Sequence, residues 1–347
     1  MERQTKMKKL SAFTRITLPL LLTLSSGAMA AEVAAQSSTI SSETLAQQQD
    51  SFIVQQQKAG FSAAQTRAFL ADAKLNQDVL NAISRPWEAK PWYQYYPLFL
   101  TEKRLQAGLD FWRAHEQTIK RAAWTYQVDP QIIVAIIGIE TFYGQFMGNY
   151  PVLDALYTLG FYYPPRADFF RSELGQLQQL ITEEHLPLSE LKGSYAGAMG
   201  YGQFISSSYR HYAVDFNGDG QRDLINNIDD AIGSVANYFH QHGWQYHQPV
   251  ALELKAQAPI DTTFLWDTKP LHFTAADILN PELSLKRSGD LDISQPAMLI
   301  ELEQLSSTEY WLGLNNFYVI TRYNRSPLYA MAVYQFSEQL KKAHDVH

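Results

Sequence analysis

Apolar side chains recur at helical spacing along most of the chain. They return every three or four positions over residues 51–85, about 101–126 and about 329–343, which predicts three helical stretches. Another helix is predicted to begin at Asp129-Pro130, because Asp favours the position before a helix and Pro its first turn. This helix, expected over residues 131–143, is almost wholly apolar and must be buried.

Two stretches interrupt the helical pattern. Residues 86–97 contain too much proline for a helix, and their aromatic side chains predict an extended wall. Residues 246–295 combine recurrent prolines with short alternating runs such as 250–254, which predict strands. The predicted fold class is mainly α, of the α+β kind, with a small β-containing subdomain inserted in a helical protein.

The chain is predicted to fall into six segments. In order, they are a signal peptide at 1–30, a flexible leader at 31–50, a helical region at 51–115, a helical core at 116–245, a β-containing subdomain at 246–305 and a C-terminal segment at 306–347 that returns to the helical core. The leader is predicted to be flexible because it is rich in Ala, Ser and Gln.

The N-terminus has the order of charges and apolar residues that is typical of a secretory signal peptide. Basic residues up to Arg15 precede the apolar run 16–24, and Ala28-Met29-Ala30 supplies the small residues of a cleavage site. This apolar run is too short to span a bilayer core of about 30 Å. We therefore expect cleavage after Ala30 and a soluble protein exported to the periplasm.

Composition and charge exclude several classes of function. The chain carries 28 Lys and Arg against 35 Asp and Glu, and without residues 1–30 the counts are 23 and 34, a net charge of −11. Such an acidic protein has no electrostatic surface for nucleic acid. The absence of cysteine excludes disulfides, thiolate metal sites, a Cys nucleophile and a lipid anchor. The aromatic fraction of 13% is compatible with a groove for flat sugar faces.

One carboxylate stands near the end of the apolar helix. The sequence there reads Ile136-Ile137-Gly138-Ile139-Glu140-Thr141. Burial disfavours an ionised carboxyl group and raises its pKa, as a general acid requires at neutral pH. Alternatively, Glu140 points to water or caps a neighbouring backbone group, and the spacing alone favours neither interpretation.

A glycine-rich loop at 193–204 bears on the choice between these two interpretations of Glu140. Its glycines allow the backbone to approach a ligand closely, and Ser194, Tyr201 and Gln203 offer hydrogen-bonding groups. A turn that only packs helices together is the alternative. Together, the loop and Glu140 favour a catalytic interpretation.

Residues 215–226 resemble the twelve-residue calcium loop of an EF-hand. Gly220 stands at position 6, where the chain turns sharply. Side chains at positions 1, 3, 5 and 9 and a carbonyl at position 7 are the predicted ligands: Asp215, Asn217, Asp219, Asp223 and Gln221. The loop predicts a structural Ca²⁺ site, and no organic cofactor is expected.

The loop departs from the standard pattern at two positions. Asn226 stands at position 12, where a bidentate Glu is usual, and Arg222 stands at position 8, where an apolar residue is usual. Asp229 or Asp230 is available to supply the missing carboxylate. A metal-free surface turn is the alternative.

These motifs together resemble the B-type lytic murein transglycosylases of bacteria. The matching stretches run in order through most of the chain: 136–141, 153–156, 192–204, 212–216, 230–239, 243–244, 316–318, 321–324 and 329–333. The resemblance implies a lysozyme-like catalytic core at 116–245, a second helical region and a small β subdomain. It also implies peptidoglycan glycan strands as the partner.

The resemblance also assigns roles to residues. Glu140 would protonate the glycosidic oxygen between N-acetylmuramic acid and N-acetylglucosamine, and then act as base on the muramoyl 6-hydroxyl to close a 1,6-anhydro ring. Ser194 and Gln203 match positions near the substrate, and Tyr201, Asn316 and Tyr323 are implied groove residues. A calcium loop belongs to the family's soluble member, but Asn226 replaces its carboxylate here. Without a lipoprotein cysteine, this chain would be a soluble member with no membrane anchor.

Two other functions stay open at this point. A hydrolytic muramidase would need a second carboxylate opposite Glu140, and Asp154 and Asp168 are the sequence candidates. A non-catalytic peptidoglycan-binding protein would keep the groove, but the intact motif around Glu140 argues against it.

Overall fold

The computed structural model describes residues 41–85, 90–257, 260–287 and 290–346. The predicted signal peptide at 1–30 lies outside these residues. Within them, no helix has both the length and the apolar character needed to cross a membrane.

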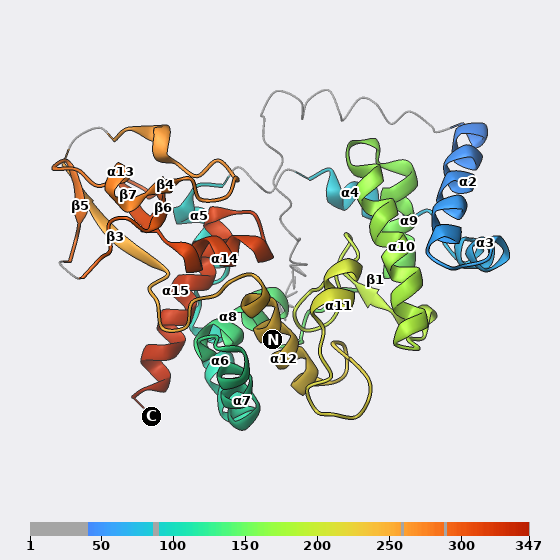
Figure 1. The fold of residues 1–347 in the computed structure, drawn as a ribbon, viewed down its shortest axis with the longest axis horizontal. Coiled ribbons are helices and arrows are strands. Elements are labelled where there is room, and N and C mark those ends of the chain that lie inside the picture. The colour runs from blue at the N-terminus through green and yellow to red at the C-terminus, as the bar shows by residue number, and fades with distance from the viewer. Residues whose placement is uncertain (1–40, 86–89, 258–259, 288–289, 347) are drawn as a thin grey trace, which may run out of the picture.

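The described residues form a mainly helical protein with a five-stranded sheet and a separate two-stranded sheet of β1 and β2 (Figure 1). The helices are α2 (Ser42–Lys58), α3 (Ala63–Ala71), α4 (Gln77–Ile83), α5 (Trp92–Tyr95), α6 (Glu102–Ala114), α7 (Glu116–Tyr126), α8 (Pro130–Thr141), α9 (Val152–Tyr162), α10 (Ala167–Glu183), α11 (Ser206–Tyr212), α12 (Ile228–Gln241), α13 (Ala275–Ile278), α14 (Asn315–Tyr323) and α15 (Pro327–His344). The strands are β1 (Tyr150–Pro151), β2 (Lys192–Gly193), β3 (Ala251–Ala256), β4 (Phe273–Thr274), β5 (Leu283–Leu285), β6 (Pro296–Glu303) and β7 (Thr308–Gly313).

Helix α8 is the centre of the fold. All of its residues from Gln131 to Thr141 are buried, and it packs against α6, α7, α12 and α15. A helix with no polar face is stable only inside such a ring of helices. Asp129 occupies the position before the helix, as predicted, but its carboxylate accepts the indole N–H of Trp244 at 2.9 Å and makes no cap bond.

A second group of helices covers the other end of the molecule (Figure 1). Helix α10 packs against α9 and α2, so helices from the start and the middle of the chain form one layer. Helix α6, by contrast, packs on α8. The predicted helical region 51–115 therefore contributes to two different layers.

The predicted flexible leader ends earlier than expected. Its last residues, 42–50, are the first half of α2, and the hydroxyl of Ser41 accepts the N–H of Thr44 to begin the helix. The prediction was wrong for 42–50 because Ala and Gln suit a helix once its apolar face is buried. Phe52 and Ile53 supply that face.

The extended wall predicted for residues 86–97 was also wrong where the chain is described. Residues 92–98 form α5 and a short 3₁₀ turn, in which Trp92 and Tyr95 are buried. Pro91 precedes α5 and Pro97 lies in the first turn of the 3₁₀ segment, where proline is tolerated.

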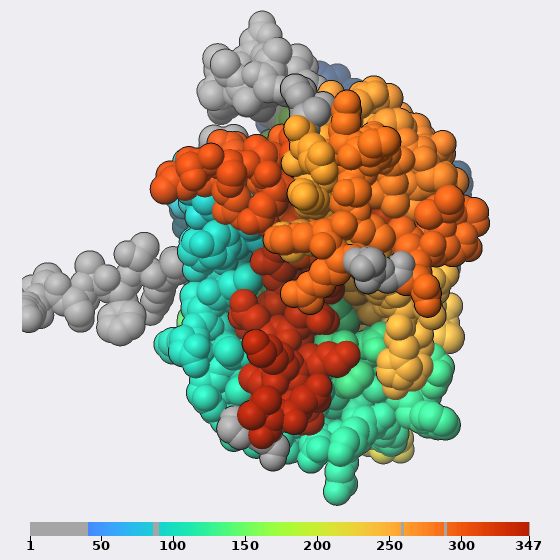
Figure 2. Space-filling model, turned by 90° about the vertical axis from the view of Figure 1, so that its left-hand side faces the viewer, coloured from blue at the N-terminus to red at the C-terminus, as the bar shows by residue number. Residues whose placement is uncertain are grey.

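A five-stranded antiparallel sheet forms the β subdomain, in the order β4-β6-β7-β3-β5. The hairpin of β6 and β7 pairs Glu303 with Thr308, so the sheet continues to Gly313 and past the predicted boundary at 305. Its own apolar cluster includes Leu254, Ile278 and Leu299. Figure 2 shows this subdomain above α15, which runs down one face of the helical core.

Candidate active site

Glu140 lies in the last turn of α8 and is only 5% exposed. Its Oε1 atom accepts a hydrogen bond from the hydroxyl of Tyr329 at 2.5 Å. Tyr329 comes from the first turn of α15, which Ser326 caps by accepting the N–H of Tyr329 at 3.3 Å. Two helices that are far apart in the sequence thus place one carboxyl group and one hydroxyl in contact.

Burial controls the protonation of Glu140. Loss of solvent raises the pKa of its carboxyl group to about 7, and the Tyr329 hydrogen bond opposes that rise. The same carboxylate raises the pKa of Tyr329, Tyr323 and Tyr95, although burial is the larger cause for each. Glu140 therefore sits among three tyrosines and changes protonation state near neutral pH.

The backbone reverses direction immediately after Glu140. Phe142 and Tyr143 both have positive φ, at 51° and 59°. Residues other than glycine rarely adopt this backbone conformation. The hydroxyl of Thr141 donates to the carbonyl of Tyr201 at 2.9 Å and accepts the N–H of Gly144 at 3.0 Å. This strained turn joins the end of α8 to the glycine-rich loop.

Close backbone contact requires glycine at the other end of this turn. A Cβ atom on Gly148, whose φ is 94°, would lie 2.1 Å from the carbonyl of Gly193. Gly148 lies outside the predicted loop, and the close contact joins two parts of the chain; the predicted approach of the loop glycines to a ligand stays a prediction.

The predicted loop residues mainly hold the loop in shape. The Ser194 hydroxyl accepts the N–H groups of Ala196 and Ala198 at 3.3 and 3.1 Å. The side-chain amide of Gln203 donates to the carbonyls of Met147 and Gly200 at 3.1 and 3.0 Å. Both side chains are buried, so they position the loop beside the turn that follows Glu140.

Tyr323 and Asn316, which are also predicted groove residues, make hydrogen bonds in different parts of the structure. Tyr323 donates its hydroxyl to the carbonyl of Gly202 at 2.6 Å, which ties α14 to the glycine-rich loop near Glu140. Asn316 is 1% exposed, and its amide bonds the backbone of Gln245 and Gln248 at 2.8–3.0 Å. Because its oxygen and nitrogen are both engaged there, Asn316 stabilises the 245–248 segment.

The aromatic face of Tyr201 packs on the turn after α8. A Cβ atom on Gly144 would lie 2.2 Å from the Tyr201 ring, so only glycine allows this contact. Tyr201 is half-buried, and its backbone carbonyl accepts the hydroxyl of Thr141, the residue after Glu140.

The predicted ligands of the acidic loop bond the loop itself. The carboxylate of Asp215 accepts the N–H groups of residues 218–220 at 2.7–3.1 Å. Asp219 accepts the N–H of Gln221 at 2.9 Å and the side-chain N–H of Asn217 at 2.7 Å. In the part of the chain that the structure describes, no group of three His, Cys, Asp or Glu side chains is placed to hold a metal.

The two residues that depart from the standard calcium loop, Asn226 and Arg222, take part in this hydrogen bonding. Asn226 donates its side-chain amide to Asp223 at 3.1 Å, and Arg222 binds Glu184, the residue after α10, through its backbone N–H and its guanidinium. Both carboxylate oxygens of Asp230 accept backbone N–H groups of the loop at 2.7–3.2 Å. In this arrangement the side-chain oxygens of the loop accept hydrogen bonds from the loop itself. No chemical step below uses a metal.

Comparison with known proteins decides the family. Residues 44–338 match the model of the transglycosylase SLT domain, which is most of the chain. The chain belongs to this family. It is also 42% identical over 296 residues to the membrane-bound lytic murein transglycosylase B of Escherichia coli K12, covering 82% of this chain and 80% of that protein.

Solved structures of other SLT transglycosylases have the same fold. The E. coli lytic transglycosylase Slt35, solved in complex with calcium, is 40% identical, with a TM-score of 0.76 and coverage of 86% of this chain and 93% of that one. SltB3 from Pseudomonas aeruginosa, solved in complex with NAG-NAM-pentapeptide, is 32% identical, with a TM-score of 0.74 and coverage of 86% and 79%.

The predicted family, the mainly helical fold class and the assignment as a lytic transglycosylase enzyme are therefore confirmed. Within this SLT transglycosylase, neither sequence candidate for a second carboxylate is presented to Glu140. Asp154 accepts the backbone N–H of Lys74 at 2.8 Å, and Asp168 pairs with Arg171 on α10. No other carboxylate among the described residues contributes to the raised pKa of Glu140.

Sequence reasoning missed two tyrosines of the site. Tyr329 falls in a stretch that matches the family, and Tyr95 falls in the predicted extended wall, so the sequence assigns neither a role. The hydroxyl of Tyr95 is buried and has no hydrogen-bond partner among the described residues. Arg104 holds the Tyr95 segment on α8, because its guanidinium donates to the carbonyls of Gly138, Leu98 and Phe99 at 2.7–3.2 Å.

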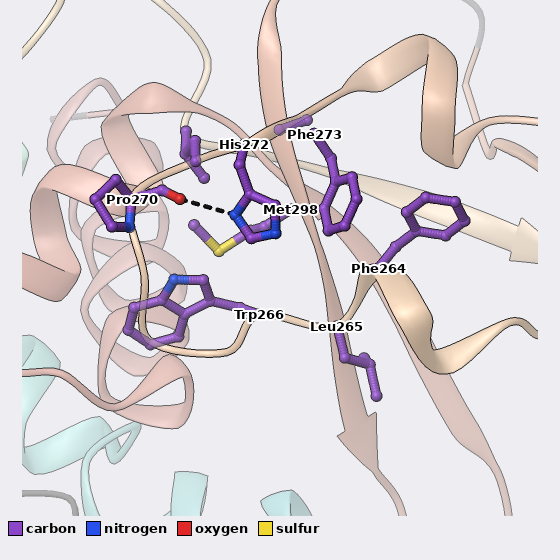
Figure 3. Close-up of a pocket in the computed structure, with 9 residues that line it drawn as sticks. Phe264, Leu265, Trp266, Pro270, His272, Phe273 and Met298 are labelled. Carbon is purple, nitrogen blue, oxygen red and sulfur yellow. Dashed lines mark hydrogen bonds between the residues drawn. The ribbon is translucent and has the colours of Figure 1, made fainter.

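A hollow in the β subdomain offers no such chemistry (Figure 3). It is lined mainly by apolar and aromatic side chains, among them Trp266, Phe273 and Met298. Its one titratable side chain is His272, whose Nδ1 atom lies 3.0 Å from the carbonyl oxygen of Pro270. Without a carboxyl group, this hollow is no alternative reaction centre.

Proposed function

We propose that this lytic transglycosylase cleaves the β-1,4 bond between N-acetylmuramic acid and N-acetylglucosamine in peptidoglycan and leaves 1,6-anhydromuramoyl ends. The observation that supports it most directly is Glu140, a buried carboxyl group with a pKa of about 7, to which no second carboxylate among the described residues contributes. Ordinary glycosidases need two carboxylates, whereas internal ring closure needs one group that first gives and then takes a proton.

In the first step, protonated Glu140 acts as the acid. Its proton passes to the glycosidic oxygen, the bond from that oxygen to C1 of the muramoyl residue breaks, and N-acetylglucosamine leaves with a new hydroxyl. Positive charge develops at C1, where the N-acetyl group of the substrate can stabilise it. The Glu140 carboxylate that remains is stabilised by the hydrogen bond from Tyr329.

In the second step, the same carboxylate acts as the base. It removes the proton of the muramoyl 6-hydroxyl while O6 forms a bond to C1, which closes the 1,6-anhydro ring and returns Glu140 to its protonated form. A pKa near 7 suits both steps, since neither protonation state is strongly favoured at neutral pH. Tyr95 and Tyr201 are the groove residues that we assign to glycan contact.

Mass spectrometry of the fragments released from peptidoglycan sacculi tests this proposal. Muropeptides that are lighter by one water and carry anhydro ends are the expected products. Reducing ends would show that water attacks C1 and would favour the hydrolytic muramidase. Sacculi that retain the protein but release no fragments would favour a binding protein.

Export to the periplasm is the second part of the proposal. Residues 1–30 carry the signal-peptide pattern, so the exported protein should begin at Ala31. Intact-mass measurement of protein recovered from the periplasm checks this start. Replacing Ala30 with Asp removes the small residue that the peptidase needs and should leave the full-length chain. A mature protein beginning elsewhere would contradict the predicted cleavage site.

Calcium binding stays a prediction of the sequence, and the structure sets a condition for it. Asp230 would have to give up backbone N–H groups to reach the ion, and Asn226 adds no charge. We therefore expect binding only at millimolar Ca²⁺, with a rise in Tm of a few degrees at about 10 mM and none at micromolar concentration. Thermal unfolding across a Ca²⁺ series, with EDTA as control, measures it. Saturation at micromolar Ca²⁺, or no shift at 10 mM, would contradict this expectation.

A further inference from the structure

The strained turn at the end of α8 is held from one side by α6. Its two residues with positive φ, Phe142 and Tyr143, both lie against that helix. Arg104, Gly108 and Phe111 are buried on α6 at spacings of four and three residues, so they share one face of the helix. Backbone strain of this kind persists only where the surrounding structure maintains it. We call these three residues the α6 clamp.

Arg104 binds the end of α8 and the ring of Phe142 together. Its Nε atom donates to the carbonyl of Gly138 at 3.2 Å, and its guanidinium carbon lies 5.1 Å from the centroid of the Phe142 ring. The same carbonyl accepts the N–H of Phe142 at 3.1 Å. Burial lowers the pKa of Arg104 to about 10, so the guanidinium stays charged at neutral pH and attracts both the carbonyl and the aromatic face.

The phenol of Tyr143 fills the space between α6 and α8. A Cβ atom on Gly108 would lie 2.3 Å from the Tyr143 hydroxyl oxygen, and one on Gly138 would lie 2.4 Å from it. The two glycines thus leave the room that the hydroxyl occupies, and the ring lies 4.9 Å from that of Phe111, between centroids. This hydroxyl is buried and has no hydrogen-bond partner among the described residues, so it holds the turn by packing alone.

We propose that Arg104 and Gly108 are positioning residues, which hold the carboxyl group of Glu140 where it reacts. Glu140 lies between the carbonyl that Arg104 binds and the strained turn that packs on Gly108. A relaxed turn would therefore move its carboxyl group away from the Tyr329 hydroxyl, which is 2.5 Å away. This inference rests on the proposed function, since it takes Glu140 to be the acid and the base.

Gly108→Ala tests the clamp without changing a reacting group. The added Cβ atom should displace the Tyr143 ring and lower kcat roughly tenfold with little change in KM, because the carboxyl group is misplaced after the substrate has bound. The alkaline limb of the pH dependence of kcat/KM should move upward, since Glu140 loses the hydrogen bond that lowers its pKa. The tyrosines around Glu140 are the same in this variant: Tyr329, Tyr323 and Tyr95.

Adding Tyr143→Phe to Gly108→Ala should restore catalysis. The second substitution removes the oxygen that the Cβ atom would overlap, and that oxygen makes no hydrogen bond among the described residues. The other close atom, Cδ2 of Leu340, ends a flexible side chain and can move. The double variant should therefore return to within about threefold of wild type, with the alkaline limb in its original place.

Gly175→Ala on α10 is the matched control, because its Cβ atom would lie 2.4 Å from the side-chain amide of Gln56, in the other layer of helices. It should leave kcat and the alkaline limb unchanged. An unmoved limb in Gly108→Ala, a loss no larger than that of the control, or a double variant that does not recover would each overturn the inference. If Gly108→Ala does not fold, Arg104→Lys decides, since it keeps the charge and loses the planar guanidinium. An unmoved limb in that variant would also overturn the inference.

A measurement without turnover separates the clamp from the proposed reaction. NMR titration of the Glu140 carboxyl carbon, assigned by its loss in Glu140→Gln, gives the pKa directly. Gly108→Ala should raise this pKa by roughly 1, as the loss of one hydrogen bond to a charged group implies. A raised pKa together with an active Glu140→Gln would leave the clamp in place and refute the reaction. An unchanged pKa in folded Gly108→Ala would refute the clamp.

Discussion

Replacing Glu140 with Gln is expected to lower release of anhydro products by about 10³-fold or more, because one group supplies both proton transfers. The amide can accept the Tyr329 hydrogen bond but can neither donate the catalytic proton nor take it back. Muropeptide release from sacculi measures the loss. Turnover within tenfold of wild type would contradict the single-carboxylate mechanism.

A buried glutamate elsewhere in the chain provides the control. Glu173 on α10 is 4% exposed, and burial raises the pKa of its carboxyl group as well. Its carboxylate accepts the backbone N–H of Ser207 at 2.9 Å and has no place in the site. Glu173→Gln should therefore retain activity within a few-fold of wild type. A loss equal to that of Glu140→Gln would show that any buried glutamate is needed for folding.

The same substitution of Glu140 should increase stability above neutral pH. The folded protein binds the Glu140 proton more tightly than the unfolded chain does, since the pKa rises from 4.5 to about 7. Stability conferred by the protonated form is therefore lost as pH rises from about 4.5 through 7, at a cost of about 3 kcal/mol. A neutral amide does not carry this cost, so Glu140→Gln should melt higher than wild type at pH 8 and similarly at pH 4. Parallel melting curves at both pH values would contradict the raised pKa.

The central helix and its carboxylate could be predicted because both follow from local pattern. The run of apolar residues before Glu140 requires burial, and a buried carboxyl group has a raised pKa wherever the rest of the chain lies. Its partner Tyr329 could not be found in this way, because 189 positions separate the two residues. Only the packing of α15 on α8 brings them together.

The sequence also does not show which polar side chains are already hydrogen-bonded within the fold. Asn316 and Ser194 are polar residues in motifs that match the family, yet the structure engages both with neighbouring backbone. The residue type shows what a side chain can bond, and the fold determines which bonds are already made. Tyr95 is the converse case, since its buried hydroxyl has no partner among the described residues.

Tyr329→Phe should move the pH dependence of catalysis and slow the reaction. The Tyr329 hydrogen bond lowers the pKa of Glu140 against the larger effect of burial. Without the hydroxyl, the carboxyl group should keep its proton to a pH above 7, so the alkaline limb of kcat/KM shifts upward. Turnover at pH 7 should fall roughly tenfold, because the carboxylate formed in the first step loses the donor that stabilises and orients it.

Tyr334→Phe is the matched control, since Tyr334 lies on the same helix and its hydroxyl donates to the carbonyl of Ala251 at 3.2 Å. This variant should keep both the rate and the position of the alkaline limb. A purely structural role for Tyr329 would lower the amount of folded enzyme and leave the limb in place. An unmoved limb in Tyr329→Phe would therefore contradict its assignment as the residue that positions and stabilises the Glu140 carboxylate.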